Sequence, residues 1–452
     1  MSGEHAAPAL TRRAVLRATL AGTFILAFEL PGQASTGAAP LNAQVRPSFT
    51  PNAFIRIDRS GTTTLVMPQV EMGQGTYTSI AMILTEELDA DFSRVVLEHA
   101  PADEKLYANP ALGIQTTGNS TSIRAFWKPL RTAAASARAA LLQAAVMRWN
   151  VPAAECSTRN GRVMHTGSGR ELGYGELVDA AAAIAVNPNP MLKDPAAFRL
   201  IGRSLKRLDA PAKVNGSATF GIDTRLPGMK VATLVSSPVL GGKVRRVDDT
   251  AARMVAGVQQ VVVLDDLVAV VGDHMWAAKQ GLQALKIDWD DGPQARASTQ
   301  DLWHQLRAAS RNPGVVAKSV GDVRAAGGAG ARVEAAYELP LLAHATMEPM
   351  NCTVQVRPDG CEVWLGTQVM SMVRDAVSKV LRLPAEKVVV HNHLLGGGFG
   401  RRLEADMARK AARIAQRVPG TPVKVVWTRE EDMRQDYYRP MYRDVVTGTL
   451  GK

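Results

Sequence analysis

The sequence predicts a mixed α/β protein made of several α+β parts. The chain has 452 residues, which corresponds to about three domains at roughly 150 residues each. Hydrophobic residues make up 46% and charged residues 21%, a composition that allows a sizeable core. Short stretches with strand alternation are interspersed with stretches of helical spacing. Disorder and coiled coil are therefore excluded as dominant features.

The first predicted part covers residues 45–190. It begins with two strands around a short Arg-Ser-Gly turn, and a loop that contains glycines leads into a helix. A second, alanine-rich helix follows, and the polar run at residues 116–122 is expected to cap it. The expected elements are strands at residues 54–58 and 62–67, the loop 70–76, a helix around residues 80–88, and a helix at residues 130–149.

A proline-containing linker at residues 187–194 separates this part from a small α/β domain at residues 200–292. Residues 293–334, which are rich in Ala, Gly and Arg, are interpreted as a connector. The expected elements of the small domain are strands at residues 230–236, 258–264, 267–272 and 286–289, and a helix at residues 275–285.

The last part, residues 335–452, has the clearest pattern. A helix that ends before Pro384 separates two pairs of strands, and a glycine cluster lies between a strand and the next helix. The expected elements are strands at residues 352–356, 361–365, 388–390 and 423–427, and helices around residues 373–381 and 402–417.

The three cysteines, Cys156, Cys352 and Cys361, have no CxxC spacing. This excludes a cysteine-held zinc site or iron-sulfur cluster within the chain, so a cluster of that kind must come from a partner. A hairpin turn at residues 357–360 places Cys361 opposite Val356, and we therefore predict no disulfide with Cys352.

The formal net charge is +11. The basic residues are spread along the chain without a Lys/Arg block, and aromatic residues make up only 5%. We therefore expect no nucleic-acid partner.

The first forty residues have the order of an export signal. Arg12 and Arg13 precede an uncharged stretch at residues 18–28 and a small-residue segment at residues 32–39. This order resembles a twin-arginine signal, which exports proteins already folded, and predicts a periplasmic protein. The alternative is an amphipathic helix that contains two adjacent arginines.

The glycine cluster at residues 396–400 is the first candidate site. Unhindered backbone N–H groups in front of a helix favour an anionic ligand, and Arg401 and Arg402 add positive charge. The spacing matches neither GxGxxG nor GxxxxGK[ST], which argues against NAD and ATP. The alternative is a tight turn between a strand and a helix.

Two glutamines are further candidates. Gln74 lies between Gly73 and Gly75 at another junction of strand and helix, and Gln368 follows Thr367 at the end of a strand. Helix capping is the alternative for Gln368.

Together these motifs resemble one family, the large molybdopterin-binding subunits of the xanthine dehydrogenase and aldehyde oxidase group. The order of the motifs is similar to that of the exported branch that contains the isoquinoline 1-oxidoreductase beta subunit. The resemblance implies molybdopterin-binding parts that flank a hammerhead-like α/β domain. It rests on EMGQG at 71–75, KVNGSATFGIDTRLPGM at 213–229, AHATMEPMNCTV at 343–354, TQ at 367–368 and GGGFGRR at 396–402.

The resemblance also implies roles for individual residues. Gln368 is similar to the glutamine beside the metal, and Phe399 with Gly400 to the backbone that lies against it. The implied cofactor is a molybdenum-pterin group, as molybdopterin or as its cytosine dinucleotide. The other residues expected to contact this cofactor are Gly73, Gln74, Gly75, Thr117, Gly118, Ser120, Gly397, Gly398 and Arg401.

The reaction implied by the resemblance is hydroxylation of an N-heterocycle or oxidation of an aldehyde, with water as the oxygen source. The implied partners are a small iron-sulfur subunit with two two-iron two-sulfur clusters, a downstream acceptor such as a cytochrome, and a small-molecule substrate.

The chain departs from the family pattern at the general base, a glutamate in a GxGE motif. Residues 173–176 read Gly-Tyr-Gly-Glu, but Glu176 begins a helical pattern, where the helix dipole explains an acidic residue. The chain ends at Lys452, and the C-terminal part of the family pattern is expected to be absent. The alternative function is therefore an exported, non-catalytic scaffold with the family fold.

The remaining chemistry-bearing residues have structural interpretations. His391 and His393 share a strand face without a third metal ligand, so no metal is expected there. His344 is expected to line the pocket and Glu348 to support it. Four methionines are expected in the core: Met347, Met350, Met370 and Met372.

Overall fold

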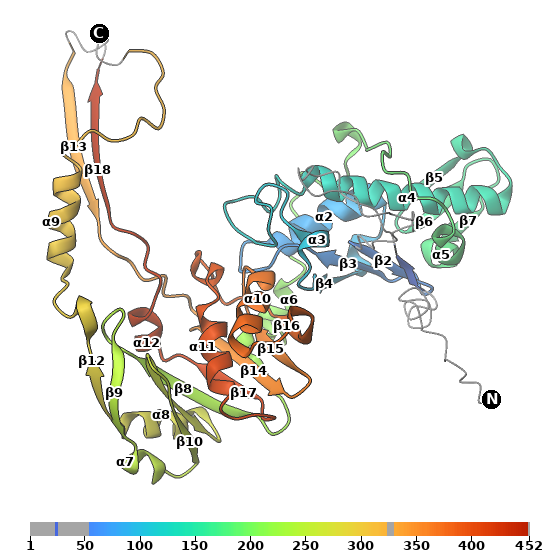
Figure 1. Ribbon diagram of the computed structural model, residues 1–452. Coiled ribbons are helices and arrows are strands. Elements are labelled where there is room, and N and C mark those ends of the chain that lie inside the picture. The colour runs from blue at the N-terminus through green and yellow to red at the C-terminus, as the bar shows by residue number, and fades with distance from the viewer. Residues whose placement is uncertain (1–22, 26–53, 323–329, 451–452) are drawn as a thin grey trace, which may run out of the picture. The chain divides into compact units, whose positions relative to one another are not determined.

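The computed structural model describes residues 23–25, 54–322 and 330–450 (Figure 1). The chain forms two compact units. Unit 1 contains residues up to 220 together with 366–375 and 389–395, and unit 2 contains the rest. Apart from strand β1 (Thr23–Ile25), the predicted export signal lies outside the described residues. Within the described ranges, no helix is both long enough and apolar enough to cross a bilayer.

Unit 1 is built on a four-stranded sheet in the order β1-β2-β3-β4. β2 (Ile55–Asp58) and β3 (Thr63–Met67) form the predicted hairpin. β4 (Val95–His99) runs parallel to β3 because helix α2 (Thr76–Leu88) makes the crossover between them. The predicted strands and the first helix are thereby confirmed.

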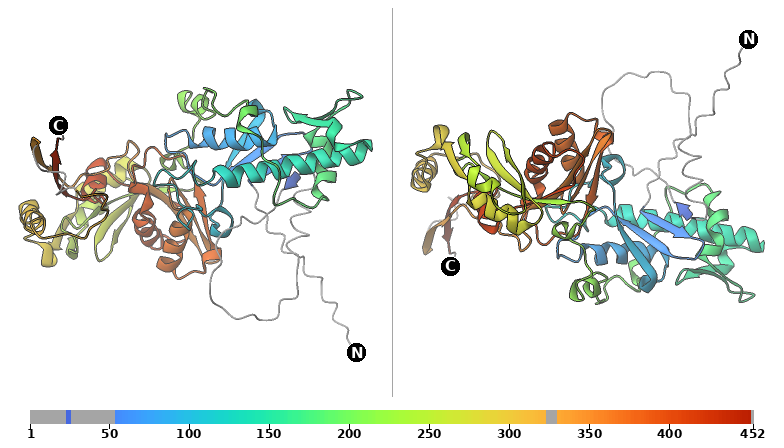
Figure 2. Two further views of the ribbon diagram at one scale, coloured as in Figure 1. Left: turned by 90° about the horizontal axis from the view of Figure 1, so that it is seen from above. Right: turned by 90° about the horizontal axis from the view of Figure 1, so that it is seen from below.

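Helices α2 and α4 (Trp127–Trp149) lie side by side on this sheet (Figures 1 and 2). Ala134 and Ala137 of α4 are fully buried. Their small side chains allow α2 and α4 to approach each other closely. The predicted cap of α4 is wrong. Phe126 is the N-cap residue and makes no side-chain capping bond, while the polar run before it contacts other loops.

The other elements of unit 1 are short. A three-stranded antiparallel meander packs against α4, and α5 follows it. Helix α10 begins in unit 1 and ends in unit 2. The bounds are α3 (Glu104–Tyr107), β5 (Cys156–Arg159), β6 (Arg162–His165), β7 (Glu171–Gly173), α5 (Tyr174–Ala182), α6 (Ala210–Val214), α10 (Met370–Leu381) and β16 (Val388–Asn392).

Unit 2 is built on a sheet with the strand order β10-β11-β8-β17-β14-β15. β8 and β17 are parallel, with Ala232 opposite Val425, so strands of the small α/β domain and of the last part share one sheet. Helix α11 packs on β14 and β17, and α8 packs on β8 and β11. The bounds are β8 (Lys230–Ser236), β10 (Val258–Val263), β11 (Leu267–Gly272), α8 (Met275–Gln283), β14 (Asn351–Arg357), β15 (Gly360–Leu365), α11 (Asp406–Ala415) and β17 (Val423–Val426).

The hairpin between β14 and β15 has the predicted register. Cys361 pairs with Val356, and Arg357 pairs with Gly360. Cys352 and Cys361 are both buried and both free.

Two further ladders complete unit 2, one of β9 with β12 and one of β13 with β18. The predicted connector at residues 293–334 is not free of structure, because it contains helix α9 (Thr299–Ala309). Ser298 and Asp301 form a capping box at the start of α9. The remaining bounds are β9 (Lys243–Asp248), α7 (Thr250–Arg253), β12 (Lys286–Asp290), β13 (Arg332–Leu339), α12 (Arg429–Arg434) and β18 (Tyr442–Thr449).

The four methionines predicted to be core residues divide evenly. Met350 and Met370 are buried, whereas Met347 is 88% exposed and Met372 is 43% exposed. The prediction is wrong for the last two, because residue type does not determine which side of a loop or helix faces the core.

A buried carboxylate ties α2 to the segment that follows the linker in unit 1. One oxygen of Glu86 accepts the backbone N–H groups of Arg199, Leu200 and Ile201 at 2.8, 2.6 and 3.2 Å. Lys193 donates to the other oxygen at 3.1 Å. Burial alone would raise the pKa of Glu86, but these hydrogen bonds outweigh burial and lower the pKa.

We predict that Glu86→Gln lowers the free energy of unfolding by about 3 kcal/mol, because the neutral amide leaves Lys193 and one or more buried N–H groups without an ionised acceptor. Urea denaturation followed by circular dichroism measures this loss. The matched control is Glu98→Gln, since Glu98 pairs with Arg56 at the surface and should contribute less than about 1 kcal/mol.

The loss should depend on pH. Because the folded-state pKa is lowered, the contribution of Glu86 is present above its unfolded pKa and disappears as the pH falls through the folded value. The difference in the free energy of unfolding between wild type and variant should therefore become smaller as the pH falls from about 6 to about 3. A gap that is constant over this range would contradict an ionised Glu86.

Candidate functional site

The loop between β3 and α2 in unit 1 is organised by the buried side chain of Glu71. One carboxylate oxygen accepts the backbone N–H groups of Gly73 and Gly75 at 2.7 and 3.1 Å, and the other accepts that of Tyr77 at 3.1 Å. Gly73 and Gly75 have φ angles of 103° and 79°, which favour glycine. The loop conformation therefore follows from the need to satisfy a buried charge.

Arg207 completes this arrangement. Its guanidinium donates to Glu71 at 3.1 Å and to the carbonyl of Gly73 at 2.9 Å, and it also binds Asp209. Burial raises the pKa of Asp209, but the hydrogen bonds from Arg207 and Lys213 outweigh burial and lower it to about 2. Gln74 is exposed at the tip of the braced loop.

Thr117 and Gln368, both predicted site residues, lie together in unit 1. The N–H of Thr117 donates to the carbonyl of Gln368 at 3.0 Å, and Nε2 of Gln368 donates to the carbonyl of Thr117 at 2.8 Å. The N–H of Val70 donates to the hydroxyl of Thr117 at 2.9 Å. Segments more than 250 residues apart are thereby joined at the edge of the 71–75 loop.

One side-chain atom at this junction has no partner. The side chain of Gln368 is nearly buried, and its Oε1 accepts no hydrogen bond from any residue that the structure describes. A buried amide oxygen in this state is costly unless a ligand supplies a donor. Gln368 does not cap α10, so the helix-cap alternative is wrong.

The segment at residues 116–122 presents a strained backbone beside this junction. Asn119 and Ser120 have φ angles of 54° and 52°, a conformation that L-residues adopt at a cost. Both are exposed, Gly118 is half-buried, and Thr117 is buried. Of the predicted residues in this segment, Gly118 and Ser120 are therefore accessible to a ligand.

A buried polar chain that the sequence does not reveal supports Thr367 and Gln368. The side-chain oxygen of Asn392 accepts the N–H of Thr367 at 2.9 Å, and its amide nitrogen lies 2.9 Å from Nε2 of His99. Nδ1 of His99 lies 2.7 Å from the hydroxyl of Tyr77. Burial and the neighbouring His393 lower the pKa of His99 to about 4. His99 is therefore neutral at physiological pH.

In unit 2 a second buried carboxylate holds the start of the glycine cluster. The N–H groups of Gly396 and Ile222 donate to the two oxygens of Glu348 at 2.9 and 3.0 Å, and Arg402 donates at 2.8 Å. A Cβ atom on Gly396 would lie 2.3 Å from Cβ of Glu348, so only glycine fits there. Glu348 thus has the supporting role expected from the sequence.

Three of the four residues that follow Gly396 have positive φ angles. Gly397, Phe399 and Gly400 have φ angles of 101°, 53° and 102°. In the described part of the chain their N–H groups, and that of Gly398, donate no hydrogen bond. Free amides of this kind bind anions or oxygen-rich ligands. The side chain of Phe399 is 68% exposed.

Two expectations about this cluster are wrong. The residues after Gly400 form a 3₁₀ turn, and α11 begins only at Asp406, so no α-helix N-terminus faces the cluster. The guanidinium of Arg401 is buried and pairs with Asp406 at 2.8 Å, and Arg402 pairs with Glu348. Their charges are neutralised inside unit 2 and add no free positive charge to the site.

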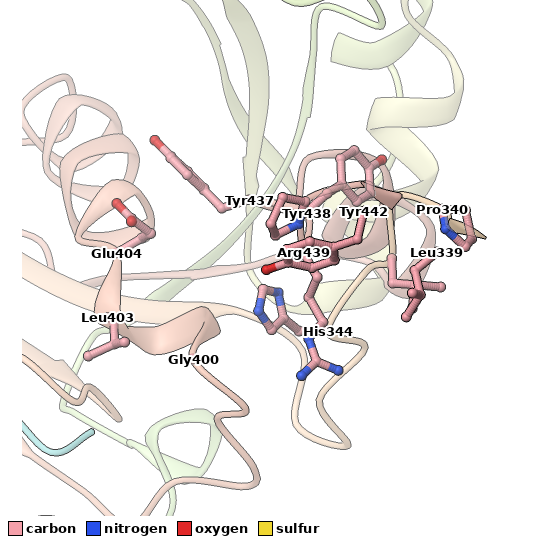
Figure 3. A pocket seen from close by; sticks show the side chains of 12 residues that line it. Leu339, Pro340, His344, Gly400, Leu403, Glu404, Tyr437, Tyr438, Arg439 and Tyr442 are labelled. Carbon is pink, nitrogen blue, oxygen red and sulfur yellow. The ribbon is translucent and has the colours of Figure 1, made fainter. Parts of the chain in front are cut away.

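A cavity of about 460 Å³ lies beside Gly400 in unit 2 (Figure 3). His344 is one of the residues that line it. Nδ1 of His344 lies 3.0 Å from a carboxylate oxygen of Asp436, and Asp436 lies 2.9 Å from Nε of Arg401. The other lining residues are Leu339, Pro340, Leu342, Leu403, Glu404, Tyr437, Tyr438, Arg439, Pro440 and Tyr442.

The Gly-Tyr-Gly-Glu segment at residues 173–176 is structural, as predicted. Glu176 accepts the N–H of Gly173 at 2.7 Å and so satisfies one backbone donor at the start of α5. Gly175 packs so closely that a Cβ would lie 2.5 Å from the carbonyl oxygen of Arg59. Among the described residues, no group of three or more His, Cys, Asp or Glu side chains is arranged to hold a metal ion.

The chain is similar to curated proteins over most of its length. An isoquinoline 1-oxidoreductase subunit beta from Brevundimonas diminuta is 34% identical, covering 89% of this chain and 58% of that protein. A membrane-bound aldehyde dehydrogenase (pyrroloquinoline-quinone) from Gluconacetobacter polyoxogenes is 30% identical, covering 97% of this chain and 58% of that protein. The chain therefore spans somewhat more than half the length of these relatives.

Among solved structures, an aldehyde oxidoreductase from Desulfovibrio gigas aligns with a TM-score of 0.45 at 15% identity. The alignment covers 82% of this chain and 42% of that chain.

Two family profiles match this chain, and both are described as a molybdopterin cofactor-binding domain. One matches residues 30–221 and the other residues 308–448. Together the two matches cover more than half of the chain and include every motif on which the family resemblance rests, except part of the segment at residues 213–229. The chain thus belongs to the molybdopterin cofactor-binding proteins of the xanthine dehydrogenase and aldehyde oxidase family.

Proposed function

We propose that the chain is the cofactor-binding subunit of an oxidoreductase that hydroxylates an N-heterocycle or oxidises an aldehyde. The observation that carries the proposal is the junction of Thr117 and Gln368 beside the 71–75 loop, where a buried amide oxygen lacks a donor. Pterin ring nitrogens and amino groups are donors of the kind that this oxygen needs.

The groups of unit 1 match the two ends of a pterin ligand. Oε1 of Gln368 offers a free acceptor suited to the pterin end, and Thr117 holds the amide nitrogen of the same side chain. Gln74, Gly118 and Ser120 are accessible and offer donors suited to a phosphate tail. When bound, the molybdenum centre would supply the two-electron oxidation of the substrate, with water as the oxygen source.

The cluster at residues 396–400 in unit 2 supplies a different kind of group. Free backbone amides attract oxygen ligands without adding a charged side chain. The role proposed for Phe399 and Gly400 is to present these amides, and the role of Glu348 is to hold the cluster in place.

The path of electrons away from this chain belongs to the same proposal. The three cysteines are widely separated or buried, so electrons would leave through a small partner subunit with two two-iron two-sulfur clusters. They would then pass to an acceptor such as a cytochrome.

Export in the folded state through Arg12 and Arg13 would deliver the loaded protein to the periplasm.

Molybdenum content per chain tests the proposal. The protein, purified with the subunits that accompany it, should contain close to one molybdenum per chain by mass spectrometry of the metal. The name of one relative includes pyrroloquinoline quinone, so that cofactor should be assayed in the same sample. A folded protein without molybdenum would contradict the proposal. Molybdenum without turnover would favour the non-catalytic scaffold.

Gln368→Ala should lower turnover about 10-fold to 100-fold with nearly normal molybdenum content. The substitution removes the side-chain amide, whereas the backbone bond from Thr117 to residue 368 remains. Assays of turnover and metal on the same preparation measure the two effects. Gln283→Ala, at the exposed end of α8, is the matched control and should change neither. Unchanged turnover in Gln368→Ala would remove this residue from the site.

Gly396→Ala should reduce molybdenum retention severalfold. The added Cβ meets Cβ of Glu348 at 2.3 Å, so the loop must move and its amides change direction. Gly314→Ala is the control, because a Cβ at Gly314 meets nothing within 4 Å. Full metal content in Gly396→Ala would show that the cluster does not help to hold the cofactor.

A further inference from the structure

We propose that Ser168, His165 and Glu155 form a second reactive site in unit 1, in which Ser168 takes up the acyl group of small activated carboxylic esters. The three side chains belong to the meander of β5, β6 and β7 and to the turn before it, which pack on α4 (Figure 1). None of them is assigned to the cofactor. The inference goes beyond the proposed function and does not depend on it.

His165, at the end of β6, bonds to both other side chains through its two ring nitrogens. Nδ1 lies 2.7 Å from the hydroxyl of Ser168, and Nε2 lies 2.8 Å from a carboxylate oxygen of Glu155. The carboxylate can only accept, so Nε2 carries the ring proton and Nδ1 accepts the hydroxyl proton of Ser168. This is the nucleophile, base and carboxylate order of serine hydrolases, with the two ring nitrogens interchanged.

The base is held in place while the nucleophile is open to solvent. The side chain of His165 is 7% exposed and that of Glu155 is 51% exposed, and Ser168 is exposed. The ring of Trp149 in α4 packs against the His165 ring with the ring centres 6.2 Å apart. The N–H of Thr166 donates to the carbonyl of Glu155 at 2.8 Å, which holds the two turns together. A substrate can therefore reach Ser168 without displacing His165.

Arg170 places a positive charge at the nucleophile. Its Nε donates to the hydroxyl oxygen of Ser168 at 2.7 Å. Its guanidinium lies 5.5 Å from the ring centre of Trp149, a contact that limits its movement. The oxygen of Ser168 thus donates a hydrogen bond to the base and accepts one from a cation. The cation lowers the cost of negative charge on this oxygen.

The turn around Ser168 leaves two backbone donors free for the acyl oxygen. The N–H of Gly169 closes the turn by donating to the carbonyl of His165 at 2.9 Å. In the portion of the chain that the structure describes, the N–H groups of Gly167 and Ser168 donate no hydrogen bond. A Cβ on Gly169 would meet nothing within 4 Å, so the space beside the turn is open. Free N–H groups next to a nucleophile stabilise the oxyanion that forms on an attacked carbonyl.

The surroundings of Ser168 select the ester by its reactivity. Gly167, Ser168 and Gly169 are all exposed, so an enclosing wall does not discriminate between acyl groups by shape. Small esters with a weakly basic leaving group are therefore the expected substrate class. Cys156 pairs with His165 across the two strands, but burial raises the pKa of its thiol, which leaves the serine as the nucleophile.

Acyl transfer to Ser168 needs no redox step. As the serine oxygen attacks the ester carbonyl carbon, its proton moves to Nδ1 of His165, and Glu155 stabilises the resulting imidazolium. The ester C–O bond then breaks, and the alcohol leaves with the proton from Nδ1. Water attacks the acyl-serine with the help of the same base, which releases the carboxylic acid and restores the serine hydroxyl.

A fluorophosphonate probe tests the nucleophile directly, because an activated serine oxygen displaces its fluoride and keeps the phosphonyl group. The purified protein with its accompanying subunits is incubated with the probe, and peptide mass spectrometry locates the label. Ser168 should be labelled about 100-fold faster than Ser157, an exposed serine on β5 of the same meander. The rate should be the same in preparations with and without molybdenum.

Hydrolysis of 4-nitrophenyl acetate measures the activity. Ser168→Ala should lower the rate of 4-nitrophenol release about tenfold, the remainder being hydrolysis by other surface groups. Ser157→Ala is the matched control and should leave the rate unchanged. Glu155→Gln should lower the labelling rate of Ser168 severalfold at an unchanged melting temperature, because the neutral amide no longer stabilises a protonated His165.

Equal labelling of Ser168 and Ser157 would overturn the assignment, and so would ester hydrolysis at the wild-type rate in Ser168→Ala. His165→Gln removes the base and should abolish the selective label. If that variant does not fold, Glu155→Gln decides, since its half-exposed side chain can be changed without disturbing the core. A wild-type labelling rate in Glu155→Gln contradicts the site, and a reduced rate supports it.

Discussion

Buried carboxylates determine the shape of both glycine loops. Glu71 in unit 1 and Glu348 in unit 2 are almost fully removed from water, and each has its two oxygens occupied by backbone N–H groups and an arginine. An ionised carboxylate without such partners would cost several kcal/mol to bury. The loops that supply the N–H groups therefore have little freedom, and their glycines allow the required turns.

The pairing of each buried carboxylate with an arginine also leaves uncharged groups of the loops free to face a ligand. In the loop around Glu71, Arg207 pairs with the Glu71 carboxylate, and Gln74 remains exposed. Around Glu348, the charge of Arg402 is used internally and the amides after Gly396 remain unbonded. The positive side chains near each loop thus brace the backbone, while uncharged groups are left for the ligand.

The strands and long helices could be predicted from the sequence because they depend on local pattern. The alternation at residues 54–67, the spacing in α4 and the turn that places Cys361 opposite Val356 all act over short distances. Helix α9 was missed although its capping residues, Ser298 and Asp301, are visible in the sequence, because the composition around it suggested a connector.

The site was predictable only in part. Thr117 and Gln368 were expected to belong to one site from family resemblance, but their direct pairing depends on tertiary contacts that no local pattern encodes. The same holds for Asp436, which lies 92 residues after His344 and yet anchors its ring. For Arg401 the local sequence was misleading. Its position next to a glycine cluster suggested a ligand contact, but its guanidinium forms a buried ion pair with Asp406.

The central claim is that the buried, unpartnered amide oxygen of Gln368 marks the place of the metal-bearing cofactor. Anomalous diffraction at the molybdenum absorption edge, from crystals of the protein with its native complement of subunits, tests this claim most directly. The account predicts one anomalous peak next to the side chain of Gln368. A peak distant from Gln368, or a fully ordered site without any peak, would contradict it.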